Sequence, residues 1–225
     1  MKLWHCADAR SFRPLWALEA LGLDYALELL PFPPRFLKPE YLQTNPLGTI
    51  PFFEDGATHM TESAAIVEYL ATRYRGQGAV DLAVDVAGPD YGAWLNWLHY
   101  GEATLTFPQT LVLRYTHFEP AERRQPQVAA DYARWFLARL RAVDAALQHS
   151  DFLCAGRFTA ADVAVAYALQ LAQHLGLDGQ FPRAVADYWL RLQARPAFQS
   201  ALRAQHRAAL EQGVDPTPSP DLRPA

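Results

Sequence analysis

The sequence predicts an α/β domain with a small sheet, followed by an all-helical domain. Over the first 75 residues, short apolar runs alternate with helical periodicity in the order strand–helix–strand and then strand–strand–helix, which matches a small sheet with helices packed on it. Beyond residue 90, apolar residues recur almost throughout at helical spacing. With 225 residues, 51% of them hydrophobic, the chain is long enough to bury a core without disulfides or metals.

The predicted strand–helix–strand unit opens the chain. Lys2–Cys6 is short and apolar, which predicts a strand. From Ser11 to Leu21 apolar residues recur at three-residue steps, with Ser11 as a candidate N-cap and Gly22 as the stop signal. Tyr25–Leu30 predicts the second strand.

After a proline-rich loop, Thr49–Glu54 predicts a third strand, which the Asp55–Gly56 turn joins to Thr58–Met60. Glu62–Tyr74 is again periodic as a helix. In the second half, further helices are predicted over residues 91–107, 120–147, 160–175, 181–194 and 196–213. The predicted boundaries are residues 1–76 for the α/β domain, 77–89 for a linker, 90–213 for the helical domain and 214–225 for a disordered, proline-rich tail.

Composition excludes several classes of function. The net charge is −4 and the basic residues are scattered, so we expect no nucleic-acid or anionic-membrane partner. Cys6 and Cys154 are the only cysteines, and their wide spacing argues against a disulfide framework, a zinc site and dithiol chemistry. The chain has no run of 18 apolar residues and no signal-peptide pattern at its start. We therefore expect a cytoplasmic protein with no bound metal.

The most informative segment is Asn45–Pro51 together with Met60–Ile66. Pro51 opens a strand and cannot donate to the ladder, so Ile50 before it keeps backbone groups free. If the Ile50–Pro51 bond is cis, these groups face outward, where an extended peptide can pair with them. At the start of the next helix, Glu62–Ser63 offers free N–H groups and a hydroxyl to a carboxylate and a side-chain carboxylate to an ammonium.

Each motif also has a purely structural interpretation. A proline at a strand edge is common, and Thr61–Ala64 is a plausible capping sequence by itself. Taken together, and with the α/β half before and the helical half after, the two motifs favour a binding site for the α-amino-acid end of a peptide.

These motifs, NPLGTIP and MTESAAIVEYL, resemble the glutathione-site signature of the cytosolic glutathione transferases. The segment Ser11–Gly22 looks like the family's first helix, and Arg157–Asp162 looks like its capping box. Thr159 and Asp162 have a structural role in this interpretation, since such a pair satisfies backbone N–H groups at a helix start. The resemblance covers about residues 1 to 205. It implies a thioredoxin-like N-terminal domain and an all-α C-terminal bundle.

The resemblance also implies roles for site residues. The backbone of Ile50 would pair with the cysteinyl part of glutathione, while Glu62 and Ser63 would hold the γ-glutamyl end. The implied glutathione-binding residues are Thr49, Ile50, Pro51, Glu62 and Ser63.

Chemistry in this family requires the thiolate of glutathione, and a free thiol with a pKa of about 8.5 is mostly protonated at neutral pH. One donor in the turn between the first strand and helix is enough to favour the thiolate. Asp8 and Arg10 stand where related classes carry a serine and a cysteine, so Ser11 is the remaining hydroxyl. The pair Arg10–Ser11 resembles a group of bacterial and fungal transferases. We predict that Ser11 donates to the sulfur and that Arg10 adds positive potential.

Two alternatives stay open for this turn. Ser11 acts only as a helix cap in the first, and Cys6 forms a mixed disulfide with glutathione in the second. A buried position of Cys6 at the strand end would favour a simple core role for it.

The second substrate is predicted to bind to the first helical segment of the C-terminal half. His99–Leu105 resembles the same bacterial and fungal group, and the bulk of the side chains around it suggests an apolar electrophile. Aromatic residues at this spacing are often core residues as well. The candidate pocket residues are Tyr100, Glu102, Leu105, Phe107, Tyr115 and Phe118.

The predicted function is conjugation of glutathione, as cosubstrate, to a hydrophobic electrophile by a homodimer. Glutathione-dependent reduction of peroxides or disulfides uses the same thiolate and is the nearest alternative. A non-catalytic binding or scaffold protein with this fold is the alternative from another class, because the turn around Asp8 and Arg10 is atypical.

Overall fold

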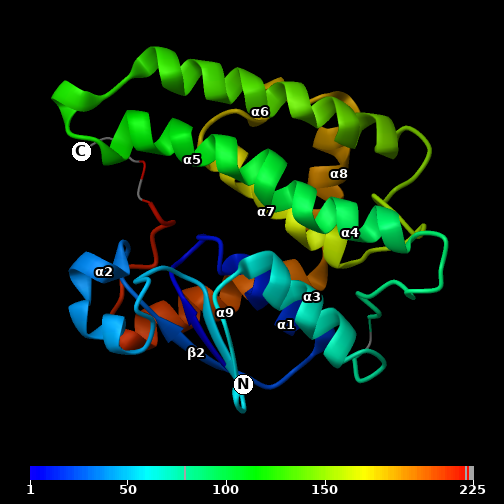
Figure 1. Ribbon diagram of the computed structural model, residues 1–225, viewed down its shortest axis with the longest axis horizontal. Coiled ribbons are helices and arrows are strands. Elements are labelled where there is room, and N and C mark those ends of the chain that lie inside the picture. The colour runs from blue at the N-terminus through cyan, green and yellow to red at the C-terminus, as the bar shows by residue number, and fades with distance from the viewer. Residues whose placement is uncertain (79, 221, 223–225) are drawn as a thin grey trace. The chain divides into compact units, whose positions relative to one another are not determined.

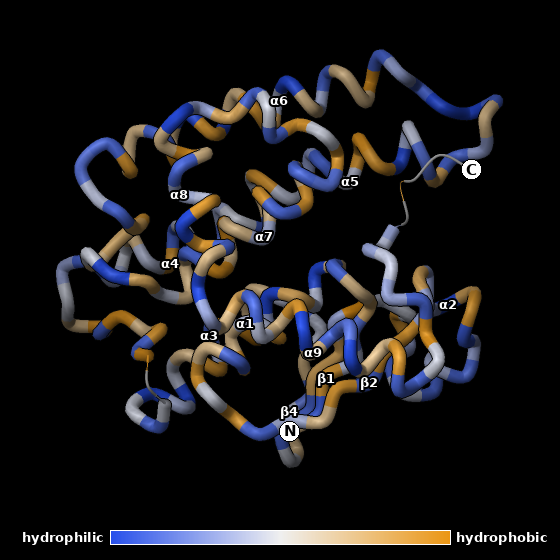
Figure 2. Tube along the Cα trace, turned by 180° about the vertical axis from the view of Figure 1, so that it is seen from behind, coloured by the Kyte–Doolittle hydropathy of each residue, from blue (hydrophilic) through white to orange (hydrophobic). Residues whose placement is uncertain are grey.

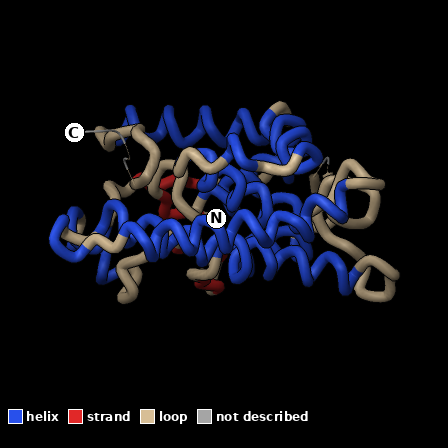
Figure 3. The backbone as a smooth tube through the Cα atoms, turned by 90° about the horizontal axis from the view of Figure 1, so that it is seen from above, coloured by secondary structure: helices blue, strands red, loops and turns tan. Residues whose placement is uncertain are grey.

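The computed structural model describes residues 1–78, 80–220 and 222. Two compact units are distinguished. Unit 1 comprises Met1–Ala83 and Ala194–Ala225, and unit 2 comprises Val84–Gln193. Among the described residues, the strands lie in unit 1 and the regular structure of unit 2 is helical (Figure 3). The predicted fold class, a small mixed sheet with helices followed by a helical domain, is confirmed.

The sheet of unit 1 has the strand order β2-β1-β3-β4. Its strands are β1 (Lys2–His5), β2 (Ala26–Leu29), β3 (Phe52–Asp55) and β4 (Thr58–Met60). β1 runs parallel to β2 and antiparallel to β3, and β3 runs antiparallel to β4. The parallel pair needs a crossover connection, which the first helix supplies.

Helices α1 (Phe12–Leu21) and α3 (Ser63–Arg73) pack against each other beside the sheet (Figure 1). Nearly all of α1 is buried, which explains its almost continuous apolar sequence. Gly22 ends the helix in the left-handed conformation, as predicted. Ser11 is the N-cap residue of α1, as predicted, but its hydroxyl makes no capping hydrogen bond. The proline-rich loop forms the short helices α2 (Pro34–Leu37) and η1 (Pro39–Gln43).

The last helix, α9 (Pro196–Gln212), groups with unit 1 and packs against α1 and β2. Its Phe198 ring meets the Phe12 and Trp16 rings edge-on, at centroid distances of 5.3 and 5.0 Å. This grouping differs from the sequence-based prediction, which has these residues in the helical domain. Helical periodicity shows that a helix has an apolar face but not which core receives that face.

The segment after α9 is also held against unit 1. The Val214 N–H donates to the Ala209 carbonyl at 2.9 Å, and the Ser219 N–H donates to the Ala7 carbonyl at 2.7 Å. This part of the chain therefore differs from the predicted disordered tail. Residues 221 and 223–225 of that prediction lie outside the described residues.

The first helical run of unit 2 is π-helical in two segments. The predicted helix over 91–107 is α-helical at α4 (Tyr91–His99) and π-helical at η2 (Tyr100–Thr106), and it continues into α5 (Phe107–Leu113) and the π-helical η3 (Arg114–Phe118). Gly101 lies where a Cβ atom would be 2.6 Å from the Ala164 backbone. Two helices therefore approach closely at a glycine in the first π-helical turn.

The remaining elements of unit 2 complete a helical bundle. They are η4 (Ala121–Arg123), α6 (Pro126–Leu147), α7 (Ala160–His174), η5 (Asp178–Gln180) and α8 (Arg183–Gln193). Hydrophilic and hydrophobic residues alternate along α6 (Figure 2), as expected for a helix with one solvent-exposed face. Most of α7 is buried. No helix among the described residues is both long and apolar enough to cross a membrane.

The predicted capping box of α7 is confirmed. The Thr159 hydroxyl accepts from the Ala161 N–H, and the Asp162 carboxylate accepts from the Thr159 N–H at 2.7 Å. The same carboxylate accepts from the Leu153 N–H at 3.1 Å and the Tyr188 hydroxyl at 2.8 Å. Burial raises the pKa of Asp162 to about 6, and these donors oppose that rise. The pair therefore organises the start of α7 and is structural, as predicted.

Candidate functional site

The strand register brings three segments of unit 1 to one end of the sheet. Because β1 and β3 are antiparallel and Trp4 pairs with Phe52, the end of β1 lies beside the start of β3. Phe53 pairs with Met60 in the next antiparallel ladder. In this antiparallel pair the start of β3, just after Pro51, lies at the same end as the end of β4, which leads through Glu62 into α3. The turn that follows β1, the proline motif and the start of α3 are therefore neighbours.

Two buried side chains donate hydrogen bonds to the proline motif. The Thr49 carbonyl accepts from the Tyr41 hydroxyl and from the Asn45 side-chain amide, each at 2.8 Å. Both Tyr41 and Asn45 are buried. The Ile50–Pro51 peptide bond is cis, which answers the question that the sequence left open. Within the described residues, Ile50 makes no hydrogen bond of its own, so its backbone groups are available to an extended ligand.

Ser63 is the first residue of α3 and is supported by an arginine from α1. The Arg13 Nη1 donates to the Ser63 Oγ at 3.0 Å, and both side chains are buried. This donation occupies a lone pair of the hydroxyl oxygen, which leaves the Ser63 O–H to donate elsewhere. Arginine charge and the N-terminus of α3 together favour an anion here.

Sequence reasoning missed Arg13. Its signal was available: a cationic residue in the first turn of a helix that is otherwise almost entirely apolar. Buried charges are normally paired or hydrogen-bonded, so such a residue calls for a polar partner. Glu62, by contrast, is exposed and makes no capping bond, as expected for a carboxylate that meets a ligand.

The turn between β1 and α1 holds the two predicted catalytic residues. The Ser11 Oγ is fully buried, accepts from the Cys6 N–H at 3.3 Å and lies 3.5 Å from the Cys6 carbonyl. The second distance is too long for a strong hydrogen bond. Arg10 is half-buried, and Asp8 takes the left-handed conformation with φ 53°. Of the two predicted catalytic side chains, only Arg10 has exposed surface.

Comparisons with known proteins show the family of the chain. Residues 1–72 match the family model of the glutathione S-transferase N-terminal domain. Glutathione S-transferase 3 of Zea mays is 30% identical over 175 residues, which cover 74% of this chain and 76% of that protein. The chain belongs to the glutathione S-transferase family.

Solved structures of bacterial transferases extend the likeness over most of the chain. A ternary complex of BphK, a bacterial transferase, superposes with a TM-score of 0.78 at 25% identity and covers 91% of this chain and 98% of its own. A sphingomonad glutathione S-transferase in complex with glutathione gives a TM-score of 0.77 at 25% identity, with the same two shares.

The Cys6 thiol of this transferase lies inside the α/β unit. Its side chain is buried in a cluster with Trp4, Tyr41 and Phe52. Burial raises the pKa of the Cys6 thiol far above its usual range. Because the thiolate is the nucleophile in disulfide exchange, this environment argues against the mixed disulfide that the sequence left open.

Side chains of the transferase's last helix reach the same turn. The Gln205 Oε1 lies 2.9 Å from the His5 Nε2 and accepts from the Asp8 N–H at 3.1 Å. The Gln205 Nε2 donates to the Asp8 Oδ1 at 2.8 Å. Sequence reasoning missed Gln205, since nothing in a polar helix position 200 residues away points to this turn.

The predicted electrophile-pocket residues of the transferase lie in unit 2 and differ in exposure. Leu105 is fully buried and belongs to the core. The Tyr100 hydroxyl donates to the Arg139 carbonyl at 2.9 Å, and the Tyr115 ring lies 5.7 Å from the Arg114 guanidinium carbon. Phe107 is 55% and Phe118 is 47% exposed. Glu102 is partly buried. A pocket role for these residues stays a prediction, with Leu105 the weakest candidate.

We expect the buried His5 to give the transferase a distinct pH dependence of stability. Burial lowers the pKa of His5 to about 4, although contacts with Gln205 and the Ser11 backbone oppose the shift. The unfolded chain binds this proton near pH 6.5, so the stability that His5 contributes is present above pH 6.5 and is lost as the pH falls toward 4.

Between pH 7 and pH 5, this one group should lower the free energy of unfolding by about 2 kcal/mol. Urea unfolding of the wild type and of His5→Gln at both pH values measures the effect. The loss on acidification should be smaller in His5→Gln by about that amount. Equal losses in the two proteins would contradict the prediction.

Proposed function

We propose that this chain binds glutathione at the shared end of β1, β3 and α3 and conjugates its thiolate to an apolar electrophile. The observation that carries the proposal is the convergence of three kinds of group at that end. These are an unpaired backbone edge at Ile50, a serine backed by the buried Arg13, and a turn with a cationic residue, Arg10.

In the proposed complex, the cysteinyl backbone of glutathione pairs with the N–H and C=O of Ile50, as a strand pairs with a sheet edge. Thr49 and Pro51 adjoin this contact and fix its direction. The γ-glutamyl carboxylate accepts from the Ser63 hydroxyl and the first N–H groups of α3. Its ammonium group lies against the Glu62 carboxylate. Charges of both signs in the ligand are thus matched.

The reaction starts from loss of the thiol proton to solvent. The sulfur electron pair then forms a bond to an electrophilic carbon, and the leaving group departs with the electron pair of the broken bond. Positive potential near the sulfur favours the thiolate and so increases the fraction of reactive cosubstrate at neutral pH.

We assign the larger share of this stabilisation to Arg10 and a smaller share to Ser11. A guanidinium acts over several ångströms and is always charged, and Arg10 has exposed surface. Ser11 is fully buried, and its oxygen already accepts from the Cys6 N–H. Its proton has only a marginal acceptor in the Cys6 carbonyl at 3.5 Å, so it can be donated once the sulfur is in place.

The Arg10–Ser11 pair and the His99–Leu105 segment support the proposal that the chain is one of the bacterial and fungal transferases that it resembles. The electrophile is proposed to contact Tyr100, Glu102, Phe107 and Tyr115. π-helical turns occur often at functional sites, and η2 and η3 include Tyr100, Glu102 and Tyr115.

Glutathione binding and conjugation test the proposal directly. The wild type should bind glutathione and transfer it to an aryl halide. Ser63→Ala should weaken binding about ten- to hundredfold, because a hydrogen bond to a charged group contributes about 1.5–3 kcal/mol. Calorimetric titration gives the affinity, and assays with an aryl halide and with cumene hydroperoxide give the reaction type.

Ser200→Ala is the matched control, since it removes a similar arginine-to-serine bond, from Arg203 at 2.8 Å. It should leave glutathione affinity unchanged. The proposal fails if the wild type shows no binding at millimolar glutathione, and conjugation is the wrong reaction if only the hydroperoxide is consumed.

The assignment of the thiolate makes a separate prediction. Arg10→Ala should raise the pKa of bound glutathione by about one unit or more, and Ser11→Ala should raise it less. Titration of the ultraviolet absorbance of the thiolate in the complex measures both values. A larger rise in Ser11→Ala would return the main role to the hydroxyl, and no rise in either variant would remove both residues from the assignment.

We also propose a two-fold dimer in the cytoplasm. The proposed interface joins the β4 hairpin and α3 of one subunit to the first helices of the bundle of its partner. Sedimentation velocity at micromolar concentration should give a single species of twice the chain mass. A monomer under those conditions would refute the dimer.

A further inference from the structure

The side chain of Gln205 makes three polar contacts with the last residue of β1 and with the turn that follows it. Its oxygen meets the His5 Nε2 at 2.9 Å and accepts from the Asp8 N–H at 3.1 Å, and its nitrogen donates to the Asp8 Oδ1 at 2.8 Å. Gln205 is 6% exposed. These contacts link α9 to a turn about 200 residues earlier in the chain.

An amide of this length suits the three contacts together. A glutamate would keep the two acceptor contacts but would lose the donor and place a second carboxylate beside Asp8. An asparagine is one methylene shorter and would not span the same distance. The pairing of Gln205 with Asp8 therefore depends on the polarity of the side chain as well as on its size.

The pairing acts on the strained residue of the turn. Asp8 has φ 53°, a left-handed conformation that is unfavourable for a residue with a Cβ atom and that Asp and Asn tolerate best. Gln205 binds both the backbone N–H and the carboxylate of Asp8 in this conformation. The Ser219 N–H adds a bond to the Ala7 carbonyl at 2.7 Å. The C-terminal segment thus fixes the path of the chain just before Arg10 and Ser11.

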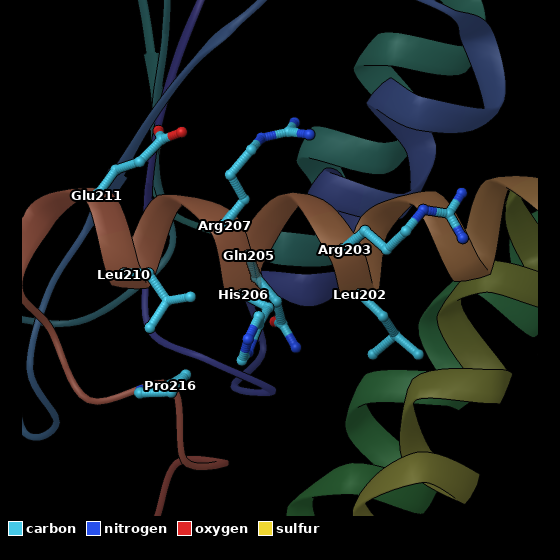
Figure 4. A pocket seen from close by; sticks show the side chains of 8 residues that line it. All are labelled: Leu202, Arg203, Gln205, His206, Arg207, Leu210, Glu211 and Pro216. Carbon is cyan, nitrogen blue, oxygen red and sulfur yellow. The ribbon is translucent and has the colours of Figure 1, made fainter.

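Gln205 borders a cavity of about 680 Å³ on the surface of α9. Figure 4 shows the side chains of Gln205 and His206 on the same side of α9 and the side chain of Arg207 on the opposite side. The polar end of the Gln205 side chain meets the buried His5 and Asp8, so truncation at position 205 removes all three contacts at once. The lining residues are Leu202, Arg203, Gln205, His206, Arg207, Leu210, Glu211 and Pro216.

We propose that Gln205 is a positioning residue for the thiolate: it holds the Asp8 turn so that Arg10 and Ser11 face the glutathione sulfur. This inference rests on the proposed function. The proposed contacts of glutathione with Ile50 and Ser63 are supported by Tyr41, Asn45 and Arg13 and do not involve Gln205. Loss of Gln205 therefore acts on the thiol and the chemical step, and it spares the affinity for the peptide.

The test compares Gln205→Ala with Gln212→Ala. Gln212 also bonds unit 1 from α9, through the Leu29 N–H and the Leu27 carbonyl, each at 2.8 Å, but it does not touch the turn. In Gln205→Ala, the pKa of bound glutathione should rise and kcat at neutral pH should fall about ten- to hundredfold, with KM for glutathione within about threefold of the wild type. In Gln212→Ala, the thiol pKa and kcat should stay at the wild-type values.

A polarity exchange separates positioning from a general loss of stability. Gln205→Glu alone should raise the thiol pKa, because the new carboxylate would lie beside the Asp8 carboxylate and repulsion between them would displace the turn. Adding Asp8→Asn supplies an amide donor to the new carboxylate and keeps a residue that tolerates positive φ. The double variant should recover most of the wild-type thiol pKa and kcat.

The inference is overturned if Gln205→Ala and Gln205→Glu match Gln212→Ala in thiol pKa and kcat. It is also overturned if the double variant is no better than Gln205→Glu. Failure of the proposed function looks different, since the wild type itself would then fail to bind glutathione or to lower its thiol pKa.

Discussion

The register between β1, β3 and β4 is the constraint on which the site depends. Trp4 opposite Phe52 and Phe53 opposite Met60 place the end of one strand, the start of the next and the start of α3 together. Side chains alternate across a strand, so a slip of one residue would turn every group of the strand to the opposite face. Burial of Leu3 and Phe53 in the core makes such a slip costly. Core packing thereby sets the geometry of groups that themselves contribute little to the core.

Two parts of the proposed site, the proline motif and Ser63, are hydrogen-bonded by buried polar side chains. Tyr41 and Asn45 hold the Thr49 carbonyl, and Arg13 holds the Ser63 hydroxyl. Buried polar groups cost free energy unless they are hydrogen-bonded, so these contacts have few alternative arrangements. Binding groups are therefore fixed before a ligand arrives, and less conformational entropy is lost when it binds.

Sequence reasoning reached the features that are encoded locally. Gly22 at the helix end, the Thr159–Asp162 capping box and the strand that follows Pro51 all follow from residue types within a few positions of each other. The partners of Arg13 and Gln205 lie 50 and about 200 residues away. No local pattern encodes those contacts, because they arise only when the sheet and α9 have packed. The same reason explains why α9 was assigned to the helical domain.

The turn around Asp8, near the start of the chain, is stabilised by Gln205 from the last helix. Alone, Asp8 looks unfavourable: it is non-glycine in a left-handed conformation and carries a negative charge near the proposed thiolate. Donation from the Gln205 Nε2 to its carboxylate, and acceptance from its N–H, offset both problems. A hydrogen-bonded carboxylate that faces Gln205 also directs its charge toward α9. The residue that made a non-catalytic protein plausible from sequence is therefore one half of a pair, and its partner lies in the last helix.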